Sequence, residues 1–396
     1  MDAFDTRYFH TNKLLLSYVG LWPLKSSSNK NIILYCTILG ILVLMLPQIA
    51  YLFKHATSLN DFYDILPTLT GASICLMKVI SLFHNFNKFR TLIQHVQYDW
   101  RLLENHENFR ILIGYVERSR LFTRAYLIFI GTTATSYITA PLTVPMLDVI
   151  LASNVTRPKK LPHSGEFFVD LEKYYYLLFA ITYLGYFVSC ASVIAIDTIY
   201  FALLQHSCGM LAILSHRLEN CIICNKSKCV DCNDISKWDK DVENVIQCVK
   251  LQIRIERLIQ LIESTFAMCL IIDIGLGVIF QCSACVMIVT HMNTMEIVRN
   301  GPLLLLQSSR IFFNSWIGQE IIDHSSQIPV AAYNGMWYET SLKVKKMFLF
   351  LLMKSQKPYC ITMVKIYVIS LKGYTMIMKT SVSYITLMMS LNSGDI

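Results

Sequence analysis

Residues 31–53 read NIILYCTILGILVLMLPQIAYLF, a run of 23 residues without a charged side chain. An α-helix rises about 1.5 Å per residue, and crossing the ~30 Å hydrocarbon core of a bilayer takes roughly 20 apolar residues. Apolar residues make up 54% of the whole chain and charged residues only 16%, well below the roughly one quarter of a soluble domain. The stretch therefore predicts a membrane-spanning helix.

Six further stretches of similar length and composition follow in the chain. With the first, they place the crossings at 31–53, 65–83, 123–145, 174–196, 265–290, 297–317 and 373–391. Only helices and closed barrels satisfy the backbone in lipid, and these lengths suit helices. The sequence thus predicts an all-α bundle of seven transmembrane helices, whose odd number puts the two chain ends on opposite sides of the membrane.

Lysine and arginine accumulate on the cytoplasmic side of membrane proteins. In this chain 25 of the 35 lie in the N-terminal tail and in the loops on the same side of the predicted membrane, whereas the opposite loops hold 5. This distribution predicts a cytoplasmic N-terminus and an extracellular C-terminus. The outer loop 146–173 carries the sequon at Asn154, a candidate glycosylation site.

Two other classes of membrane protein remain as alternative functions. A G-protein-coupled receptor has the opposite orientation, and the Asp/Glu-Arg-Tyr and Asn-Pro-x-x-Tyr motifs of that class do not occur at the expected crossings. A secondary transporter typically shows internal repeats, and we find none here. The charge count and the missing motifs thus disfavour a metabotropic receptor, and the lack of an internal repeat and the odd number of helices disfavour a transporter.

Short motifs in a fixed order point to one family. They are GLWP at 20–23, Gly318 and Glu320 after the sixth crossing, AAYN at 331–334, WYE at 337–339 and KTSVSYITL at 379–387. With the inverted topology, this order resembles the insect odorant receptors over essentially the whole chain, and more specifically a ligand-tuning subunit of the hymenopteran type. Gustatory-type receptor channels, the nearest alternative, usually have a Gln-Phe pair where this chain has Met388 to Leu391. The family's co-receptor has a longer loop between the fourth and fifth crossings.

The resemblance implies a mechanism and a set of partners. Such receptors are heterotetrameric cation channels of tuning subunits and a co-receptor, in the plasma membrane of olfactory sensory neurons, which open when a small apolar odorant binds in the helical bundle. Besides the co-receptor, the partners are the odorant and membrane lipid. The implied regions are a cytoplasmic segment (1–30), crossings one to six with the ligand pocket (31–330), a cytoplasmic anchor segment (331–372), and a pore-lining helix with a short extracellular tail (373–396).

The seventh crossing has one face that is polar towards the cytoplasm and apolar towards the outside. At 100° per residue, this face carries Met376, Thr380, Ser383, Leu387 and Leu391. The opposite face carries Met378, Val382, Ile385 and Met389. Repeated leucines around a shared axis can close a pore by dewetting, and the resemblance places Leu387 and Leu391 at that gate. Ordinary helix packing is the alternative interpretation.

An odorant pocket should be apolar and aromatic, with a few hydroxyl groups. We predict it in the outer halves of crossings two, three, four and six. The predicted residues are Leu69, Ala72, Ser73, Thr132, Thr135, Thr139, Tyr175, Phe179, Thr182, Tyr183, Leu304 and Gln307. Packing of helix against helix could equally account for many of them.

Among the ionisable residues within the predicted crossings, three are notable: Asp273, Arg310 and Lys379. Such groups cost about 2.5–3.5 kcal/mol on insertion scales and normally face a partner or water. We expect one basic group to pair with Asp273 and to help couple the pocket to the pore helix. Snorkelling of these side chains to the interface is the alternative.

Nothing in the chain indicates catalysis or a cofactor. It has no Gly-rich phosphate loop, no His-Glu-x-x-His and no nucleophile elbow. Cys221, Cys224, Cys229 and Cys232 have metal-ligand spacing, but the four-residue spacer is short for a zinc ribbon, so we expect unpaired cysteines and no metal. The net charge of +8 lies in the cytoplasmic loops, which face anionic lipid, and does not predict nucleic-acid binding.

Overall fold

The computed structural model describes residues 3–24, 29–55, 59–104, 107–142, 161–222, 235–291, 294–363, 365 and 367–393. The described chain is almost entirely helical. Its elements are η1 (Ala3–Asp5), α1 (His10–Val19), α2 (Asn29–His55), α3 (Leu59–His84), α4 (Phe86–Leu103), α5 (Phe109–Thr139), η2 (Ala140–Leu142), α7 (Leu171–Glu219), α8 (Ile235–His291), α9 (Thr294–Ser326), α10 (Ile328–Asn334), η3 (Trp337–Glu339), α11 (Leu342–Ser355), β1 (Thr362–Met363), β2 (Tyr367–Val368) and α12 (Leu371–Ser393). The two strands form a short antiparallel hairpin.

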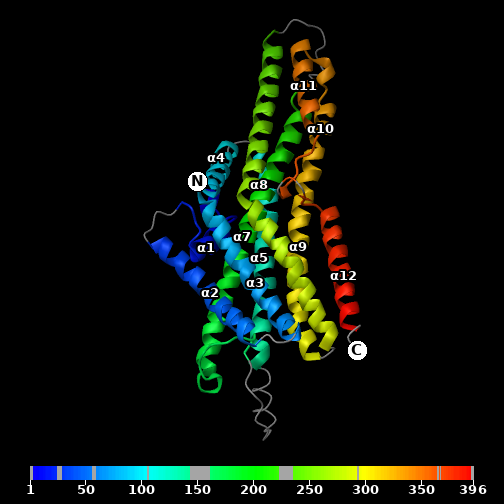
Figure 1. Cartoon of the computed structure of the whole chain (residues 1–396). Coiled ribbons are helices and arrows are strands. Elements are labelled where there is room, and N and C mark those ends of the chain that lie inside the picture. The colour runs from blue at the N-terminus through cyan, green and yellow to red at the C-terminus, as the bar shows by residue number, and fades with distance from the viewer. Residues whose placement is uncertain are drawn as a thin grey trace.

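Six predicted crossings lie wholly within a long helix, and the third, predicted at 123–145, lies in one up to Thr139, where α5 ends; the seven-helix bundle is confirmed. The seven are α2, α3, α5, α7, α8, α9 and α12. Among the described residues, four stretches are long and apolar enough to span a bilayer by length and composition alone: Asn29–His55, Asp64–His84, Leu171–Glu219 and Lys240–Ile288. The bundle runs lengthwise in Figure 1, where α12 and the C-terminus lie at its lower right and the N-terminus lies higher, beside α4.

Two helices continue far beyond their apolar segments. α7 has 49 residues and α8 has 57, which at 1.5 Å per residue makes them about 74 Å and 86 Å long. Their extensions pack with α10 and α11 into a second helical layer at the upper end of the bundle (Figure 1). The fourth crossing was predicted to end at residue 196, because apolarity falls there, but the helix itself continues to Glu219.

The centre of the bundle is α7. Residues 192–211 are buried without interruption, and the helix contacts α2, α3, α5, α8 and α9. It begins at Asp170, whose side chain accepts hydrogen bonds from the backbone N–H groups of Glu172 and Lys173, as an N-cap does. Helices that are apolar on all sides are buried on all sides, so α7 forms the core against which the other crossings pack.

Two glycines permit close approaches in this packing. A Cβ at Gly185 of α7 would lie 2.8 Å from Leu44 Cγ and 3.0 Å from the Gly40 carbonyl oxygen on α2. Gly20, in the GLWP motif, ends α1 with a φ of +79°, and a Cβ there would lie 2.7 Å from the backbone nitrogen of Leu34. Small residues allow backbones to approach in this way. The glycines therefore set how closely α1 and α7 lie against α2.

Candidate functional site

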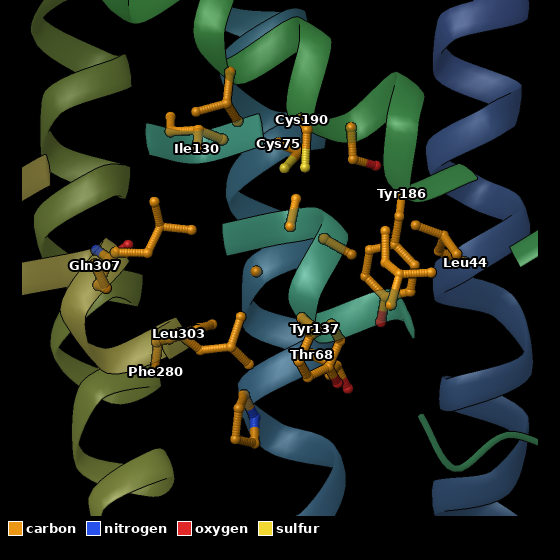
Figure 2. A pocket seen from close by; sticks show the side chains of 18 of the residues that line it. Leu44, Thr68, Cys75, Ile130, Tyr137, Tyr186, Cys190, Phe280, Leu303 and Gln307 are labelled. Carbon is orange, nitrogen blue, oxygen red and sulfur yellow. The ribbon is translucent and has the colours of Figure 1, made fainter. Parts of the chain in front are cut away.

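A cavity of about 120 Å³ lies among α2, α3, α5, α7, α8 and α9. Its wall is mostly apolar and includes Leu44, Ile130, Val193, Phe280, Leu303 and Leu306. Figure 2 shows labelled side chains from several of these helices converging on one space. A cavity of ~150 Å³ with such a lining holds benzene and stays dry, so this one is of a size for a small volatile molecule.

The segment before α7 is hydrogen-bonded to two tyrosines of the cavity wall. Tyr137 and Tyr186 line the wall. The Tyr137 hydroxyl donates to the Pro162 carbonyl oxygen at 3.0 Å, and the Tyr186 hydroxyl lies 3.2 Å from His163 Nδ1. His163 is itself buried, at 6% exposure. Residues 162 and 163 are therefore joined to the cavity wall through two tyrosines.

The same segment is held by polar contacts to α2 and α3. The Ser164 hydroxyl donates to Asp64 Oδ2 at 2.8 Å. The carboxylate of Glu166 accepts from Lys54 at 3.4 Å and from His55 at 2.8 Å. Burial lowers the pKa of His163 to about 4, against a smaller opposing effect of the Asp64 carboxylate. At neutral pH His163 is therefore uncharged, as its buried place beside Tyr186 requires.

A cluster of four charged side chains lies beside the cavity, and one of them, Arg310, lines its wall. Arg310 of α9 lines the cavity and directs Nη2 at Asp273 Oδ1 of α8, 2.6 Å away. Lys78 Nζ of α3 lies 3.0 Å from Asp273 Oδ2 and 2.5 Å from Asp197 Oδ1 of α7. Arg310 Nε lies 3.4 Å from Asp197 Oδ2. Two cations and two anions from four helices therefore form one electrically balanced network.

Neutral side chains complete the hydrogen bonding of this network. The Tyr126 hydroxyl of α5 donates to Asp197 Oδ2 at 2.7 Å, and Asn314 Nδ2 donates to Asp273 Oδ2 at 3.1 Å. The Asp273 side chain is 1% exposed and that of Lys78 is 3% exposed. Buried charges are tolerated when they are paired and hydrogen-bonded, and both conditions hold here.

The structure confirms that a basic group pairs with Asp273 and identifies the partners as Arg310 and Lys78. Lys379 is exposed on α12. Asp197 is not among the predicted intramembrane charges, because it lies one residue beyond the predicted end of the fourth crossing. Lys78 lies within the second predicted crossing, but the sequence does not indicate its partners. The two carboxylates that it contacts lie 119 and 195 residues further along the chain. A role for the cluster in coupling stays a prediction.

Of the predicted ligand residues, Ala72 and Gln307 lie in the cavity wall. The other ten lie outside it. Thr132, Thr135, Thr139 and Tyr183 are exposed; Leu69, Ser73, Phe179 and Leu304 are half-buried; Tyr175 and Thr182 are buried elsewhere. The predicted residues thus lie on another face of α5, and nearer to the start of α7, than the residues that line the cavity.

On α5 the three predicted residues are exposed threonines. The hydroxyl groups of Thr132, Thr135 and Thr139 donate to carbonyl oxygens four residues earlier in their own helix, so they need no partner in the bundle. The face of α5 towards the cavity instead carries Ile130, Ala134, Tyr137 and Ile138. On α7 the wall is formed about three turns further on, by Tyr186, Ser189, Cys190 and Val193.

Sequence reasoning also omitted two helices that contribute to the wall. α2 supplies Leu44 and Gln48, and α8 supplies Phe280. The sequence does contain an indication that Gln48 faces inward, because its amide side chain interrupts the apolar run of the first crossing. Polar residues in such runs usually face the interior of a bundle.

The predicted pore residues lie on the helix at the edge of the bundle. α12 contacts α8 and α9, and it buries Gly373, Ile377 and Ser381 against them. Thr380, Ser383 and Leu387 are exposed, Leu387 at 54%. Val382, predicted on the opposite face, is also exposed. The side chain of Leu391 lies outside the described residues, and the pore role of the others stays a prediction.

Two further predictions fall mostly outside the described residues. Asn154 lies in the stretch 143–160, and Cys224, Cys229 and Cys232 lie in the stretch 223–234, neither of which the structure describes. Cys221 is described, and it is a buried free thiol. Its pKa is raised by a hydrogen bond with Cys248 and by burial, so its thiol is protonated at neutral pH.

Comparisons with known proteins agree with the motifs and the fold. A family profile described as 7tm odorant receptor matches residues 58–382. Odorant receptor Or2 of Anopheles gambiae is 22% identical over 79% of this chain and 80% of its own length. Odorant receptor 13a of Drosophila melanogaster is 22% identical over 95% and 94%. Odorant receptor 10 of Aedes albopictus is 32% identical, but the match spans only 26% of that protein.

Solved structures show the same fold at low sequence identity. The olfactory receptor OR5 of Machilis hrabei, solved in complex with eugenol, superposes with a TM-score of 0.79 at 12% identity, over 98% of this chain and 100% of that one. A second structure of the same receptor gives a TM-score of 0.76 at 11% identity over the same shares of the two chains. At such identities the likeness concerns the arrangement of the helices.

Proposed function

Because this chain belongs to the odorant receptor family of insects, whose members are multi-pass membrane receptors and not enzymes, we propose that it is an odorant-gated cation-channel subunit. It binds a small apolar ligand in its helical bundle and assembles with the family's co-receptor into a heterotetramer. Its place of action is the plasma membrane of olfactory sensory neurons, with the N-terminus in the cytoplasm, as its distribution of lysine and arginine predicts.

The cavity among the six helices is the observation that carries this proposal. It is small and apolar, and it contains aromatic side chains, as expected for a site that selects volatile molecules. The OR5 receptor, which has the same arrangement of helices, was solved in complex with eugenol, a small aromatic molecule. We therefore assign the odorant site to this cavity, with Ala72 and Gln307 retained from the sequence prediction.

The route from the cavity to the pore helix runs along α8. Phe280 lines the cavity. The next residue, Gln281, donates to Met378 Sδ of α12 at 3.6 Å, and Cys282 Sγ donates to the Ser381 carbonyl oxygen at 3.8 Å. A ligand that displaces Phe280 thus moves the face of α8 on which α12 rests. A second contact, between the rings of Phe312 and Tyr374, joins α9 to α12 with 5.5 Å between ring centroids.

α12 is suited to line a shared pore because one face packs on its own protomer and the other is exposed. The exposed face carries hydroxyl groups at Thr380 and Ser383 and an apolar group at Leu387. Around a central axis, rings of such residues would form a wetted vestibule and a hydrophobic constriction. Movement of α8 against α12 then changes the width of this constriction.

Whole-cell recording of cells that co-express this chain and a co-receptor tests the proposal. We expect a panel of small volatiles to evoke non-selective cation currents that persist when G-protein signalling is blocked. Cells that express the co-receptor alone are the control for ligand selectivity. A response that disappears with the G-protein block would instead establish a metabotropic receptor. Saturable solute flux against a gradient, without channel current, would establish a transporter.

A further inference from the structure

Most polar groups in the cavity wall already have partners within the protein. The Tyr137 hydroxyl donates to Pro162, and the Tyr186 hydroxyl bonds with His163. The Ser189 hydroxyl donates to the carbonyl oxygen of Gly185 in its own helix, at 2.9 Å. The hydroxyl hydrogens of Tyr137 and Ser189 are thus already committed, and these two groups can offer a ligand only an acceptor oxygen.

The polar side chains at the end of the cavity where Arg310 lies also have hydrogen-bond partners within the protein. Arg310 Nη1 donates to Gln307 Oε1 at 3.0 Å, while its Nη2 and Nε face Asp273 and Asp197. Gln307 Nε2 lies 3.5 Å from the Asp273 carbonyl oxygen. Since two carboxylates balance two cations in this cluster, the guanidinium does not select an anionic ligand.

Gln48 of α2 is the exception. Its side chain lines the cavity and is 1% exposed. The amide oxygen accepts from the Thr68 hydroxyl at 3.0 Å, and this hydroxyl also donates to the Ile65 carbonyl oxygen of its own helix at 3.0 Å. The amide nitrogen, Nε2, has no hydrogen-bond partner among the residues that the structure describes. Buried polar groups are nearly always hydrogen-bonded, so a donor of this kind in an apolar cavity points to a ligand atom that accepts.

We propose that the cavity takes a neutral apolar volatile with one acceptor oxygen, a ketone, aldehyde or ester, and that this oxygen accepts a hydrogen bond from Gln48 Nε2. This inference rests on the proposed function, because it assumes that the cavity is the odorant site. Gln48 then determines ligand class, while the apolar wall determines size. A carboxylic acid is disfavoured, because its charge would enter the cavity without a counter-ion.

The expected preference for a ketone over an alkane is that of a single hydrogen bond. One neutral hydrogen bond contributes about a tenfold change in a binding constant. The wild-type protein should therefore bind a ketone about tenfold more tightly than the alkane of equal chain length. Gln48→Leu replaces the amide by an apolar side chain of similar size. It should reduce this ratio to about one, because it weakens the binding of the ketone and not that of the alkane. Thr68→Val, which releases the amide oxygen, should reduce the ratio in part.

Ligand-induced thermal stabilisation of the purified full-length protein measures these ratios without requiring a channel. The ligands are a ketone, an ester, a primary alcohol and an alkane of equal length, and the control variant is Gln94→Leu on the exposed surface of α4. If Gln48→Leu does not fold, Gln48→Met provides the same test. An unchanged ketone-to-alkane ratio in the folded variant would overturn the proposal, as would tighter binding of the alcohol than of the ketone.

The same variants recorded as currents with the co-receptor separate the two proposals. Binding that depends on Gln48, without odour-evoked current, leaves the ligand class standing and refutes the channel function. Currents whose ketone-to-alkane preference survives Gln48→Leu support the channel and refute the assignment of the ligand class.

Discussion

The balanced ionic cluster makes Asp273→Asn the most informative substitution in this protein. The change removes one of two carboxylates and leaves Lys78 and Arg310 facing Asp197 alone, so the cluster acquires an uncompensated positive charge. Breaking a buried ion pair in this way costs about 3–5 kcal/mol. That is a large fraction of the roughly 5–15 kcal/mol by which folded proteins are typically stable. We expect a much lower unfolding temperature and reduced delivery to the cell surface.

A second substitution shows whether charge balance is the cause. Adding Lys78→Met to Asp273→Asn restores one cation facing one anion. The double variant should therefore be more stable than the sum of the two single effects predicts, with an interaction free energy of about 1–3 kcal/mol. Asp323→Asn is the matched control, because Asp323 is exposed on α9 and such changes usually stay within ~0.5 kcal/mol.

The assay is thermal unfolding of the detergent-solubilised protein, combined with surface biotinylation in the expressing cells. Two results would refute the reasoning. The first is an Asp273→Asn variant as stable as Asp323→Asn. The second is a double variant no more stable than additive single effects predict, because the charge balance of the cluster would then be irrelevant to folding.

Three further substitutions test other parts of the structure. Gly185→Ala places a Cβ 2.8 Å from a neighbouring side chain on α2 and should cost about 1–3 kcal/mol, whereas Gly114→Ala, where the added atom meets nothing within 4 Å, should be neutral or stabilising in the same unfolding assay. The pKa of His163 in the folded protein, about 4, lies below its unfolded value near 6.5. The stability that the neutral ring contributes is therefore complete above pH 6.5 and is lost as pH falls towards 4, by an amount on the order of 3 kcal/mol; His163→Phe should flatten unfolding temperature against pH over this interval, and an unchanged slope would contradict the assignment. Leu387→Ser should wet the proposed constriction and produce current without ligand in cells that express the co-receptor, while Val382→Ser on another side of α12 should leave the basal current near zero; equal leak from both would argue against a gate at Leu387.

The amino-acid sequence by itself determined the number and type of the crossings. Whether a stretch such as 31–53 can span a bilayer depends on its own length and apolarity, which are local properties. The number of lysines and arginines in each loop is also a local property. It predicts the orientation in the membrane without knowledge of any contact. The ordered motifs identified the family for a similar reason, since each one is contiguous in the chain.

Only the tertiary structure decided which faces form the cavity and which charges meet. The sequence of a helix that is apolar all round gives little indication of which side faces inward. The sequence of α5 alone therefore did not show whether Thr132 or Tyr137 faces the cavity. The partner of Asp273 depended on bringing α3 beside α8, across 195 residues of chain. That Gln48 Nε2 has no hydrogen-bond partner among the described residues depends on the positions of all polar groups around it. Contacts of this kind are properties of the packed bundle, because hydrogen bonds and ion pairs depend on distances between segments that the order of residues along the chain does not specify.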